Sequence, residues 1–413
     1  MTFPTDSRHD FVSSANGLRI HSGRDALARL GPELARMGCR RPLLLCGASV
    51  AATGLPQRIA GGLAYGGATV FAGLGREAPL ASVLQAVEAA REAGADGFVA
   101  IGAGSTLRAA RVVAILLAET RPVAELVTRY PPDGPAVGAR LPALKLPIVN
   151  VLTAATTAQN RGGSALVAEG WDHRLEFFDP KTRPRAIYWD ADALMTAPDR
   201  LVRDNGAMVW WRALMSMAVV RRANPLVQAS RHQAWALSRS AMAALATPEG
   251  LRRPGPRIDL CAAALLQNRD EDDGGTPMQA HRPARMVYAL GAALFARVPG
   301  ISQAAAYSAL TCAALGLAFS DAEGPAAGEG AELVAGFADA LALPAGASPA
   351  EVLGAVEQAL LAMGQPVQLR CLLPDADGLE AVAAFAGKSF NADREREFQR
   401  HPQRLVELLR RAW

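Results

Sequence analysis

The residues that most directly suggest chemistry form a short glycine turn at positions 102–106, Gly-Ala-Gly-Ser-Thr. The turn follows an apolar run and opens a segment with helical periodicity. Glycine lets a backbone come close to a phosphate, and the free N–H groups at a helix start favour a negative charge. We therefore predict that Gly102, Gly104, Ser105 and Thr106 bind a phosphate group. A tight turn without a ligand is the alternative, and the strand–turn–helix context favours the phosphate site.

A second polar turn, 153–160, follows the next apolar run of the chain. Small hydroxyl residues that come after a parallel strand lie at the carboxyl edge of the sheet, where such folds bind ligands. Thr153, Thr156 and Thr157 are therefore predicted to join the glycine turn, together with Gly47, which ends an earlier apolar run. A polar loop with helix-capping threonines is the alternative. Two such turns on neighbouring segments favour a site for a dinucleotide.

The elements that must position these residues follow from the hydrophobic pattern. Short apolar runs at 42–47, 68–71, 97–102 and 147–152 predict strands, and helical patterns at 80–93 and 106–119 lie among them. This alternation indicates a parallel sheet with both faces covered. From about residue 195, segments with helical periodicity dominate, at 198–222, 227–246, 302–318, 328–342, 349–363 and 402–412. We predict a Rossmann-like α/β domain over 1–194 that binds the dinucleotide, and an all-α domain over 195–413 that closes the active-site cleft.

The segment 268–283 is polar and contains glycine and proline, which predicts a mobile loop.

Composition excludes several classes of protein. The net charge of +4 is spread along the chain, whereas a nucleic-acid-binding protein shows a concentrated basic stripe. The longest strongly apolar stretch, 112–118, is too short to span a bilayer. The N-terminus has no basic segment followed by an apolar run, and the five cysteines form no CxxC pair. We expect a cytoplasmic protein that has neither nucleic acid nor membrane as a partner.

Several segments occur in an order found in a known family. The run 96–105, DGFVAIGAGS, is followed by the turn at 152–160, by Asp190 to Gly206, by Leu290-Gly291 and by His401-Pro402. This order resembles that of the iron-containing alcohol dehydrogenase superfamily over nearly the whole chain. The resemblance implies the fold shared by these enzymes and dehydroquinate synthase, NADH or NADPH as cofactor, and a homodimer formed through the N-terminal sheet.

The metal-binding positions of this family differ in the present sequence. Members bind a divalent metal with one Asp and three His. The corresponding positions hold Met208, Arg212, Ala284 and the pair Val298-Pro299, and a shifted register puts Asn205 and Val209 at the first two. Because no set of four nitrogen or oxygen ligands remains, we expect no catalytic metal.

A related group, the maleylacetate reductases, has a turn similar to residues 102–111, GAGSTLRAAR. This resemblance implies reduction of an unsaturated or oxo diacid with NAD(P)H. Arg108 stands where those enzymes have glycine, and Arg111 replaces a lysine. The substrate of that group therefore does not transfer to this chain.

Hydride transfer requires a group that stabilises a developing oxyanion and a group that donates a proton. Without a metal, Arg212 at a former histidine position is predicted to supply the positive charge. Tyr288, at the second histidine of an HxxxH pair, is predicted to donate the proton. Arg108, with Arg161 and Arg285, would suit a small anionic substrate. The alternatives are that Arg212 pairs with an acid and that Tyr288 packs with a satisfied hydroxyl.

Three hypotheses on function follow. The first is a metal-independent NAD(P)H-dependent reductase of a small anionic oxo or unsaturated compound. Cys46-Gly47-Ala48-Ser49 carries no acid that would repel a 2′-phosphate, so NADPH is permitted as well as NADH. The second is a non-redox enzyme, or a binding or scaffold protein, that retains the fold. The third is the dehydroquinate synthase group, which also needs a metal and is disfavoured by the same missing ligands.

Overall fold

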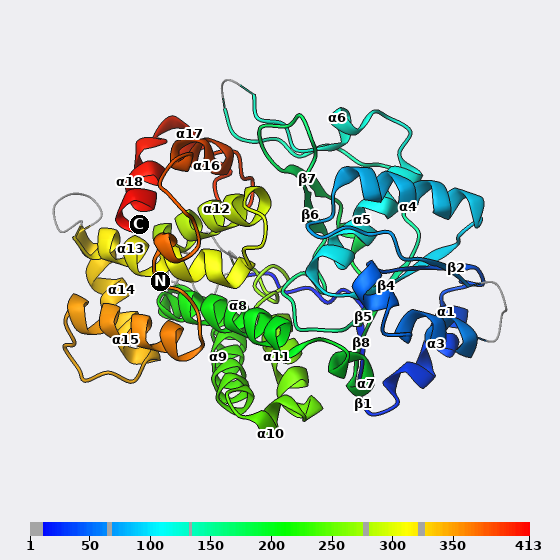
Figure 1. Ribbon diagram of the computed structural model, residues 1–413, viewed down its shortest axis with the longest axis horizontal. Coiled ribbons are helices and arrows are strands. Elements are labelled where there is room, and N and C mark those ends of the chain that lie inside the picture. Colours follow the sequence, from blue (N-terminus) through cyan, green and yellow to red (C-terminus); the bar gives the residue numbers. More distant parts are fainter. Residues whose placement is uncertain (1–10, 64–67, 132–133, 276–280, 321–326) are drawn as a thin grey trace, which may run out of the picture. The chain divides into compact units, whose positions relative to one another are not determined.

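A computed structural model describes residues 11–63, 68–131, 134–275, 281–320 and 327–413 (Figure 1). These residues form two compact units, which we call the sheet unit and the helical unit. The sheet unit comprises 16–202 and 248–261. The helical unit comprises the described residues before Asn16, 203–247 and 262–413. Both units are therefore discontinuous in sequence.

The two units differ from the predicted ranges 1–194 and 195–413. The boundary falls eight residues later, between 202 and 203, and the segment 248–261 returns to the sheet unit. Hydrogen bonds hold the segment 248–261 in the sheet unit: Arg257 donates to the backbone oxygens of Leu194 and Ala197, at 2.8 and 3.1 Å. Gln159 Nε2 also donates to the backbone oxygen of Cys261, at 2.8 Å.

The sheet has six described strands in the order β1-β8-β5-β4-β2-β3, and all neighbouring pairs are parallel. The strands are β1 (Arg19–Gly23), β2 (Pro42–Leu45), β3 (Thr69–Phe71), β4 (Gly97–Gly102), β5 (Ile148–Leu152) and β8 (Ala186–Asp190). The four predicted strands are confirmed as β2 to β5. β1 and β8 were not predicted; β1 is a largely exposed edge strand with polar residues, which gives it no apolar run.

Helices connect the strands, as expected for a parallel sheet. They are α1 (Leu30–Arg36), α2 (Ala48–Ala51), α3 (Leu55–Gly62), α4 (Leu80–Glu92), α5 (Gly104–Ala118), α6 (Val123–Leu126) and α7 (Ala191–Met195). The apolar residues of β2, β4, β5 and β8 form a core with those of α1 and α3. α5 follows β4 directly, so the turn between them lies at the carboxyl edge of the sheet.

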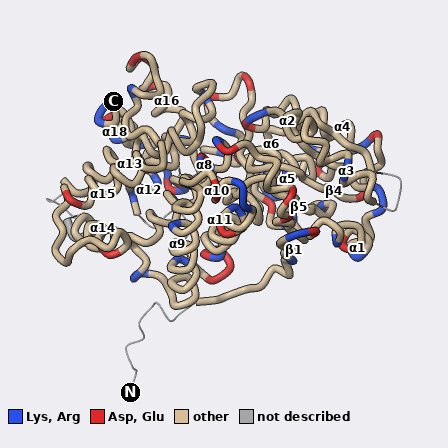
Figure 2. Tube along the Cα trace, turned by 60° about the horizontal axis from the view of Figure 1, so that its bottom comes forward, with Lys and Arg blue, Asp and Glu red and all other residues tan. Residues whose placement is uncertain are grey.

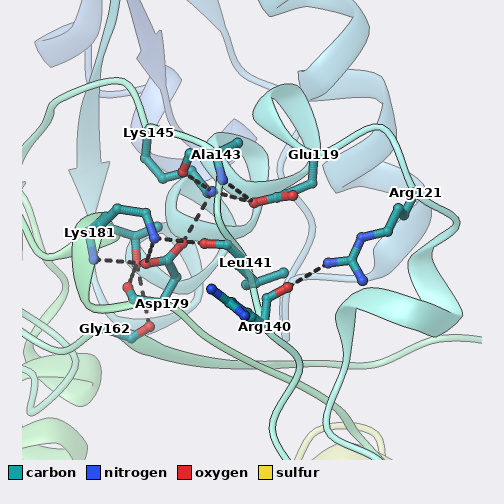
Figure 3. A network of polar contacts seen from close by, with 10 residues as sticks. Glu119, Arg121, Arg140, Leu141, Ala143, Lys145, Gly162, Asp179 and Lys181 are labelled. Carbon is teal, nitrogen blue, oxygen red and sulfur yellow. Dashed lines mark hydrogen bonds and ion pairs between the residues drawn. The ribbon is translucent and has the colours of Figure 1, made fainter.

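An antiparallel hairpin that was not predicted, β6 (Gly163–Leu166) and β7 (Leu175–Phe178), packs on α5. Close to it, a buried charge network joins the end of α5 to two loops (Figure 3). Lys145 Nζ lies 2.7 Å from Glu119 Oε1 and 3.2 Å from Asp179 Oδ2. Lys181 Nζ lies 3.0 Å from Asp179 Oδ1. The network therefore holds the loop before β5 and the turn after β7 against α5.

The helical unit contains most of the remaining helices. Their bounds are α8 (Asp199–Met217), α9 (Pro225–Leu245), α10 (Pro248–Leu251, in the sheet unit), α11 (Pro254–Leu266), α12 (Arg282–Arg297), α13 (Gln303–Ser320), α14 (Ala327–Ala340), α15 (Pro349–Ala362), α16 (Leu379–Ala386), α17 (Glu397–Arg400) and α18 (Gln403–Arg411). α12 and α13 lie close together because Gly291 faces the ring of Tyr307, where an added Cβ would lie 2.4 Å from Cδ2. α13 is long and apolar enough to cross a membrane, and half of it is buried within the protein.

Residues 268–275 lie outside helix and strand, as the predicted loop requires, but this segment is partly buried and α12 begins at Arg282. Asp270 and Asp273 are buried, and Arg231 Nη2 lies 2.8 Å from Asp270 Oδ2. His281 is buried at the N-cap of α12, where its Nδ1 accepts from the N–H of Ala284 at 3.3 Å. The residues between, 276–280, lie outside the described part of the chain. The polar composition of this segment thus reflects buried hydrogen bonds and a helix cap.

In the view of Figure 2, basic and acidic residues of the described chain are interspersed.

Candidate functional site

The glycine turn joins the end of β4 to the start of α5. Ala103 is the N-cap residue, with φ −112° and ψ −159°, and its methyl group cannot cap the helix. The N–H groups in the first turn of α5 therefore need an acceptor from elsewhere. An anion fits this position because of the N–H groups and the helix dipole together.

Crowding explains why the turn contains two glycines. A Cβ added at Gly102 would lie 2.6 Å from Thr106 Oγ1 and 2.9 Å from Thr106 Cβ. One added at Gly104 would lie 3.2 Å from Thr156 Oγ1. Thr106 is buried beneath the turn, so its role is to pack against Gly102. The absence of a side chain at Gly102 therefore makes room for Thr106, and the absence of one at Gly104 lets the backbone lie close to Thr156.

The structure brings the second polar turn to the first. The N–H of Thr153 donates to the backbone oxygen of Gly102 at 3.1 Å, and Thr153 is buried. Thr156 Oγ1 accepts from the N–H of Ala158 at 3.1 Å, while Thr156 and Thr157 are both partly exposed. Thr153 thus connects the two turns, and Thr156 lies beside Gly104.

Gly47 lies at the same edge of the sheet, because β2 pairs in parallel with β4. A Cβ at Gly47 would lie 3.0 Å from the backbone oxygen of Leu74, in the loop after β3. The close approach of the Leu74 oxygen is therefore a reason for glycine at position 47 that does not depend on a ligand.

Arg108 extends from α5 back over the glycine turn. Its Nη2 donates to Ser105 Oγ at 3.2 Å, and its Nη1 donates to the backbone oxygen of Ala165 at 3.2 Å. Because Ser105 Oγ accepts from a guanidinium, its own proton is directed to another acceptor. Arg108 and Ser105 thus form a donor pair at the turn.

A second arginine, Arg111, lies one turn along α5 and is fully buried. Its Nε donates to Ser164 Oγ at 2.9 Å and its Nη1 to the backbone oxygen of Ala158 at 2.7 Å. Burial, together with the nearby charges of Arg108 and Arg161, lowers the pKa of Arg111 to about 9. The hydrogen bonds recorded for Arg111 within the described chain go to a hydroxyl and a carbonyl, and none goes to a carboxylate. The result is a concentration of positive charge beside the turn.

One acidic residue at this site, Glu77, was missed by sequence reasoning. Its Oε2 lies 3.7 Å from Arg108 Nη2. Burial raises the pKa of Glu77 to about 7, although Arg108, Arg76 and Arg174 act in the opposite direction. No motif marks this glutamate, and only the tertiary contact with α5 reveals it.

The predicted catalytic residues Arg212 and Tyr288 belong to the helical unit and contact different partners. Arg212 is buried on α8, with its Nη1 2.6 Å from Asn268 Oδ1 and its Nη2 3.1 Å from the backbone oxygen of Gln267. Tyr288 on α12 is partly exposed, and its hydroxyl accepts from Asn391 Nδ2 at 3.5 Å. Arg212 thus holds the amide of Asn268 in place, whereas the phenol of Tyr288 is accessible.

An aromatic residue that the sequence did not single out joins these two helices. Tyr307 on α13 lies edge-on to Trp211, with centroids 4.9 Å apart, and to Tyr288, at 6.2 Å. Trp211 Nε1 also donates to Thr311 Oγ1 at 2.8 Å. These contacts fix the direction of α8 and α12 relative to α13 within the helical unit.

Arg285 was predicted to add positive charge, but carboxylates accompany it. Its Nη2 lies 3.1 Å from Asp393 Oδ1 and 3.2 Å from Glu397 Oε2. These ion pairs offset its charge, so Arg285 is a poor candidate for binding an anionic substrate.

The residues at the family's metal-binding positions do not fit a divalent metal. Arg212 offers only donors, and the methyl group of Ala284 offers no ligand atom. Within the described residues, no group of three or more His, Cys, Asp or Glu side chains is placed to hold an ion.

The chain is similar to several known proteins. Residues 18–191 match the family described as iron-containing alcohol dehydrogenase. Maleylacetate reductase 2 of Cupriavidus pinatubonensis is 37% identical over 111 residues, which are 27% of this chain and 30% of the relative. The 4-hydroxybutyrate dehydrogenase of Cupriavidus necator is 29% identical over 187 residues, 45% of this chain and 48% of the relative. The matches thus span less than half of these relatives.

Solved structures extend the likeness to the whole chain at the level of fold. A 1,3-propanediol oxidoreductase superposes with a TM-score of 0.77 at 18% identity, covering 98% of this chain and 100% of that one. Maleylacetate reductase from Agrobacterium tumefaciens superposes with a TM-score of 0.67 at 19% identity, covering 98% of each chain. Residues 18–191 thus match the iron-containing alcohol dehydrogenase family, and the chain shares the fold of the 1,3-propanediol oxidoreductase over nearly its whole length.

Proposed function

We propose that this protein is a metal-independent, NAD(P)H-dependent reductase of a small anionic oxo or unsaturated compound. The observation that carries the proposal is the start of α5. Its first turn has no side-chain cap from Ala103, and its two glycines are held against Thr106 and Thr156. The maleylacetate reductase and hydroxybutyrate dehydrogenase relatives support the reaction class.

The cofactor would bind through its pyrophosphate. The N–H groups at the start of α5 and the hydroxyl of Ser105 would donate to the phosphate oxygens, and Arg108 would offset their charge. Gly47 and the residues after it present no carboxylate to a ribose phosphate, which permits NADPH as well as NADH. When bound, the reduced nicotinamide supplies a hydride.

The substrate would require two further contributions from the chain. A hydride added to the carbon of a carbonyl group leaves an electron pair on oxygen, which must be stabilised and then protonated. We propose Tyr288 as the proton donor, since its hydroxyl is accessible, and Arg212 as the fixed positive charge. We propose an anionic substrate because Arg108, Arg111 and Arg161 place positive charge beside the turn.

Binding of the cofactor is the first test. The full-length protein is titrated with NADH and with NADPH, and its melting temperature and the nicotinamide fluorescence are followed. We expect saturable binding of at least one of them. The matched variants are Ser105→Ala, which removes a proposed phosphate donor, and Ser320→Ala in the helical unit as a control. No binding of either cofactor at millimolar concentration would overturn the proposal.

Metal independence is tested separately by elemental analysis and by assay after treatment with EDTA. We expect substoichiometric zinc and iron and an unchanged rate. Stoichiometric metal that is needed for the rate would contradict this part of the proposal.

A panel of 2-oxo and 2,3-unsaturated mono- and dicarboxylates then identifies the substrate. With that substrate, we expect Tyr288→Phe to lower kcat more than it lowers the affinity for NAD(P)H.

A second candidate is a non-redox enzyme or a binding protein that retains the fold. It is favoured by the pairing of Arg285 with two carboxylates and by the engagement of Arg212 with Asn268. Saturable cofactor binding without oxidation of NAD(P)H by any compound of the panel would favour this candidate.

We also propose a cytoplasmic homodimer. β1 is the last strand at one edge of the sheet and pairs, among the described strands, with β8 alone. An unpaired edge offers backbone hydrogen bonds to a second copy. Light scattering coupled to size-exclusion chromatography measures the mass, and a monomer at micromolar concentration would contradict the dimer.

A further inference from the structure

Glu77 lies in the loop after β3, in a backbone conformation that its contacts must maintain. The φ angles of Glu77 and Ala78 are 65° and 54°, in the left-handed region that side chains other than glycine rarely adopt. Ala78 is fully buried, and Pro79 forms a bridge with Val167. The N–H of Leu80 also donates to the backbone oxygen of Val167 at 2.9 Å. Contacts with the hairpin segment therefore set the direction of the Glu77 side chain.

The carboxylate of Glu77 is held among guanidinium groups and is largely removed from water. The side chain is 14% exposed, and its Oε1 is buried without a hydrogen bond. Three cations face it: Arg76 from the same loop, Arg108 from α5 and Arg174 from the segment before β7. Burial outweighs their effect and raises the pKa of Glu77 to about 7. Both protonation states are therefore populated near neutral pH.

Arg108 connects this carboxylate to the glycine turn. The same atom, Nη2, lies 3.7 Å from Glu77 Oε2 and donates to Ser105 Oγ at 3.2 Å. A phosphate bound at the turn would add negative charge on the Ser105 side of this guanidinium. Ionised Glu77 would then compete with the phosphate for the charge of Arg108, and the two anions would repel each other.

We infer that Glu77 is a positioning residue of the proposed nucleotide site: it holds Arg108 at the turn and takes up a proton from solvent when a phosphate group binds there. The inference rests on the proposed binding of a dinucleotide. Protonation turns the carboxylate into a neutral acid and leaves the charge of Arg108 to the phosphate. Because phosphate binding and protonation of Glu77 favour each other, the nucleotide binds more tightly at low pH and more weakly once Glu77 is ionised.

The size of the effect follows from this linkage. If binding raises the pKa of Glu77 by one unit, the affinity falls by about tenfold between a pH well below 7 and a pH well above 8. Proton uptake per bound nucleotide passes through a maximum between the pKa values of the free and bound states.

The test measures the Kd of NADH from pH 6 to 8.5, because the bridging pyrophosphate of NADH has no proton that titrates in this range. The variant Glu77→Gln keeps the size of the side chain and removes its titration. The matched control is Glu88→Gln, on the exposed face of α4. For the wild type and Glu88→Gln we expect a Kd that rises about sevenfold between pH 6 and 8.5, and for Glu77→Gln a change of less than about twofold.

Calorimetry of the wild type in two buffers of different ionisation enthalpy gives a second measurement, which does not depend on the folding of any variant. We expect net proton uptake near pH 7. The same pH dependence of Kd in wild type and Glu77→Gln, or no proton uptake by the wild type, would overturn the inference and leave nucleotide binding intact. Absence of binding of NADH and NADPH at every pH would overturn the proposed function and this inference with it.

Discussion

Gly102→Ala tests whether the crowding at the glycine turn is as tight as the structure indicates. The added Cβ would lie 2.6 Å from Thr106 Oγ1 and 2.9 Å from Thr106 Cβ. Rotation about χ1 of Thr106 moves Oγ1 but not Cβ, which is attached to the first turn of α5. The 2.9 Å contact can therefore be relieved only by displacing the backbone of the turn or of the helix start.

The expected cost is that of an overpacked buried site, about 1–3 kcal/mol in the free energy of unfolding. Gly61→Ala is the matched control, since Gly61 lies exposed in α3 and an added Cβ meets nothing within 4 Å. Alanine is the better helix former by up to about 1 kcal/mol, so this control is expected to be neutral or stabilising. The double variant Gly102→Ala/Thr106→Ala removes the 2.6 Å contact with Oγ1 but keeps the 2.9 Å contact with Cβ. We therefore expect it to recover part of the stability lost by Gly102→Ala alone.

Urea denaturation measures the stability of each variant, and fluorescence titration measures its affinity for NADH. We expect Gly102→Ala to bind NADH at least about tenfold more weakly, which corresponds to about 1.4 kcal/mol. The control should keep the affinity of the wild type. A Gly102→Ala protein with unchanged urea midpoint and unchanged Kd would refute the argument that this turn is closely packed and binds phosphate.

Two other predictions concern buried charge and pH. Lys145→Met leaves the buried carboxylates of Glu119 and Asp179 without their shared ammonium, and should lower the free energy of unfolding measured in urea by about 3–5 kcal/mol. Lys181→Met, at the rim of the network, should lower it by about 1 kcal/mol or less. Equal losses for the two variants would contradict the role of Lys145 in this network. Burial lowers the pKa of His281 from 6.5 to about 4, so its contribution to stability is present above pH 6.5 and is lost as the pH falls through 4. Melting temperature against pH should therefore fall less steeply for His281→Gln than for the wild type, and parallel curves would count against a buried neutral histidine.

Local pattern was sufficient to predict several elements. β2 and β4 are continuous apolar runs, and β5 is one apart from Asn150, because both faces of a parallel sheet are covered. Such runs are recognisable without any partner strand. The turn at 102–106 was predicted for the same reason, since a strand, two glycines and a helix start are adjacent in sequence. α8, α9, α13, α14, α15 and α18 were predicted from their periodicity, whereas no range was predicted for α10, α11, α12, α16 or α17.

Other features depend on partners that are distant in sequence. β1 has no apolar run because it is an exposed edge strand, and its pairing with β8 brings together residues more than 160 positions apart. His281 was placed in a loop because its neighbours are polar, whereas it caps α12 and its Nε2 lies 2.9 Å from the backbone oxygen of Met215. No local rule distinguishes a buried polar residue from a solvated one.

For this protein, the sequence by itself determined the parallel sheet, the helical second half and the position of the glycine turn between a strand and a helix. These are properties of residue type and short-range order. The tertiary structure alone decided which charges surround the turn: Arg111 is buried against the hairpin, Arg285 is offset by Asp393, and Glu77 lies beside Arg108. The physical reason is that burial and electrostatic coupling depend on distances in space, which the spacing of residues along the chain does not contain.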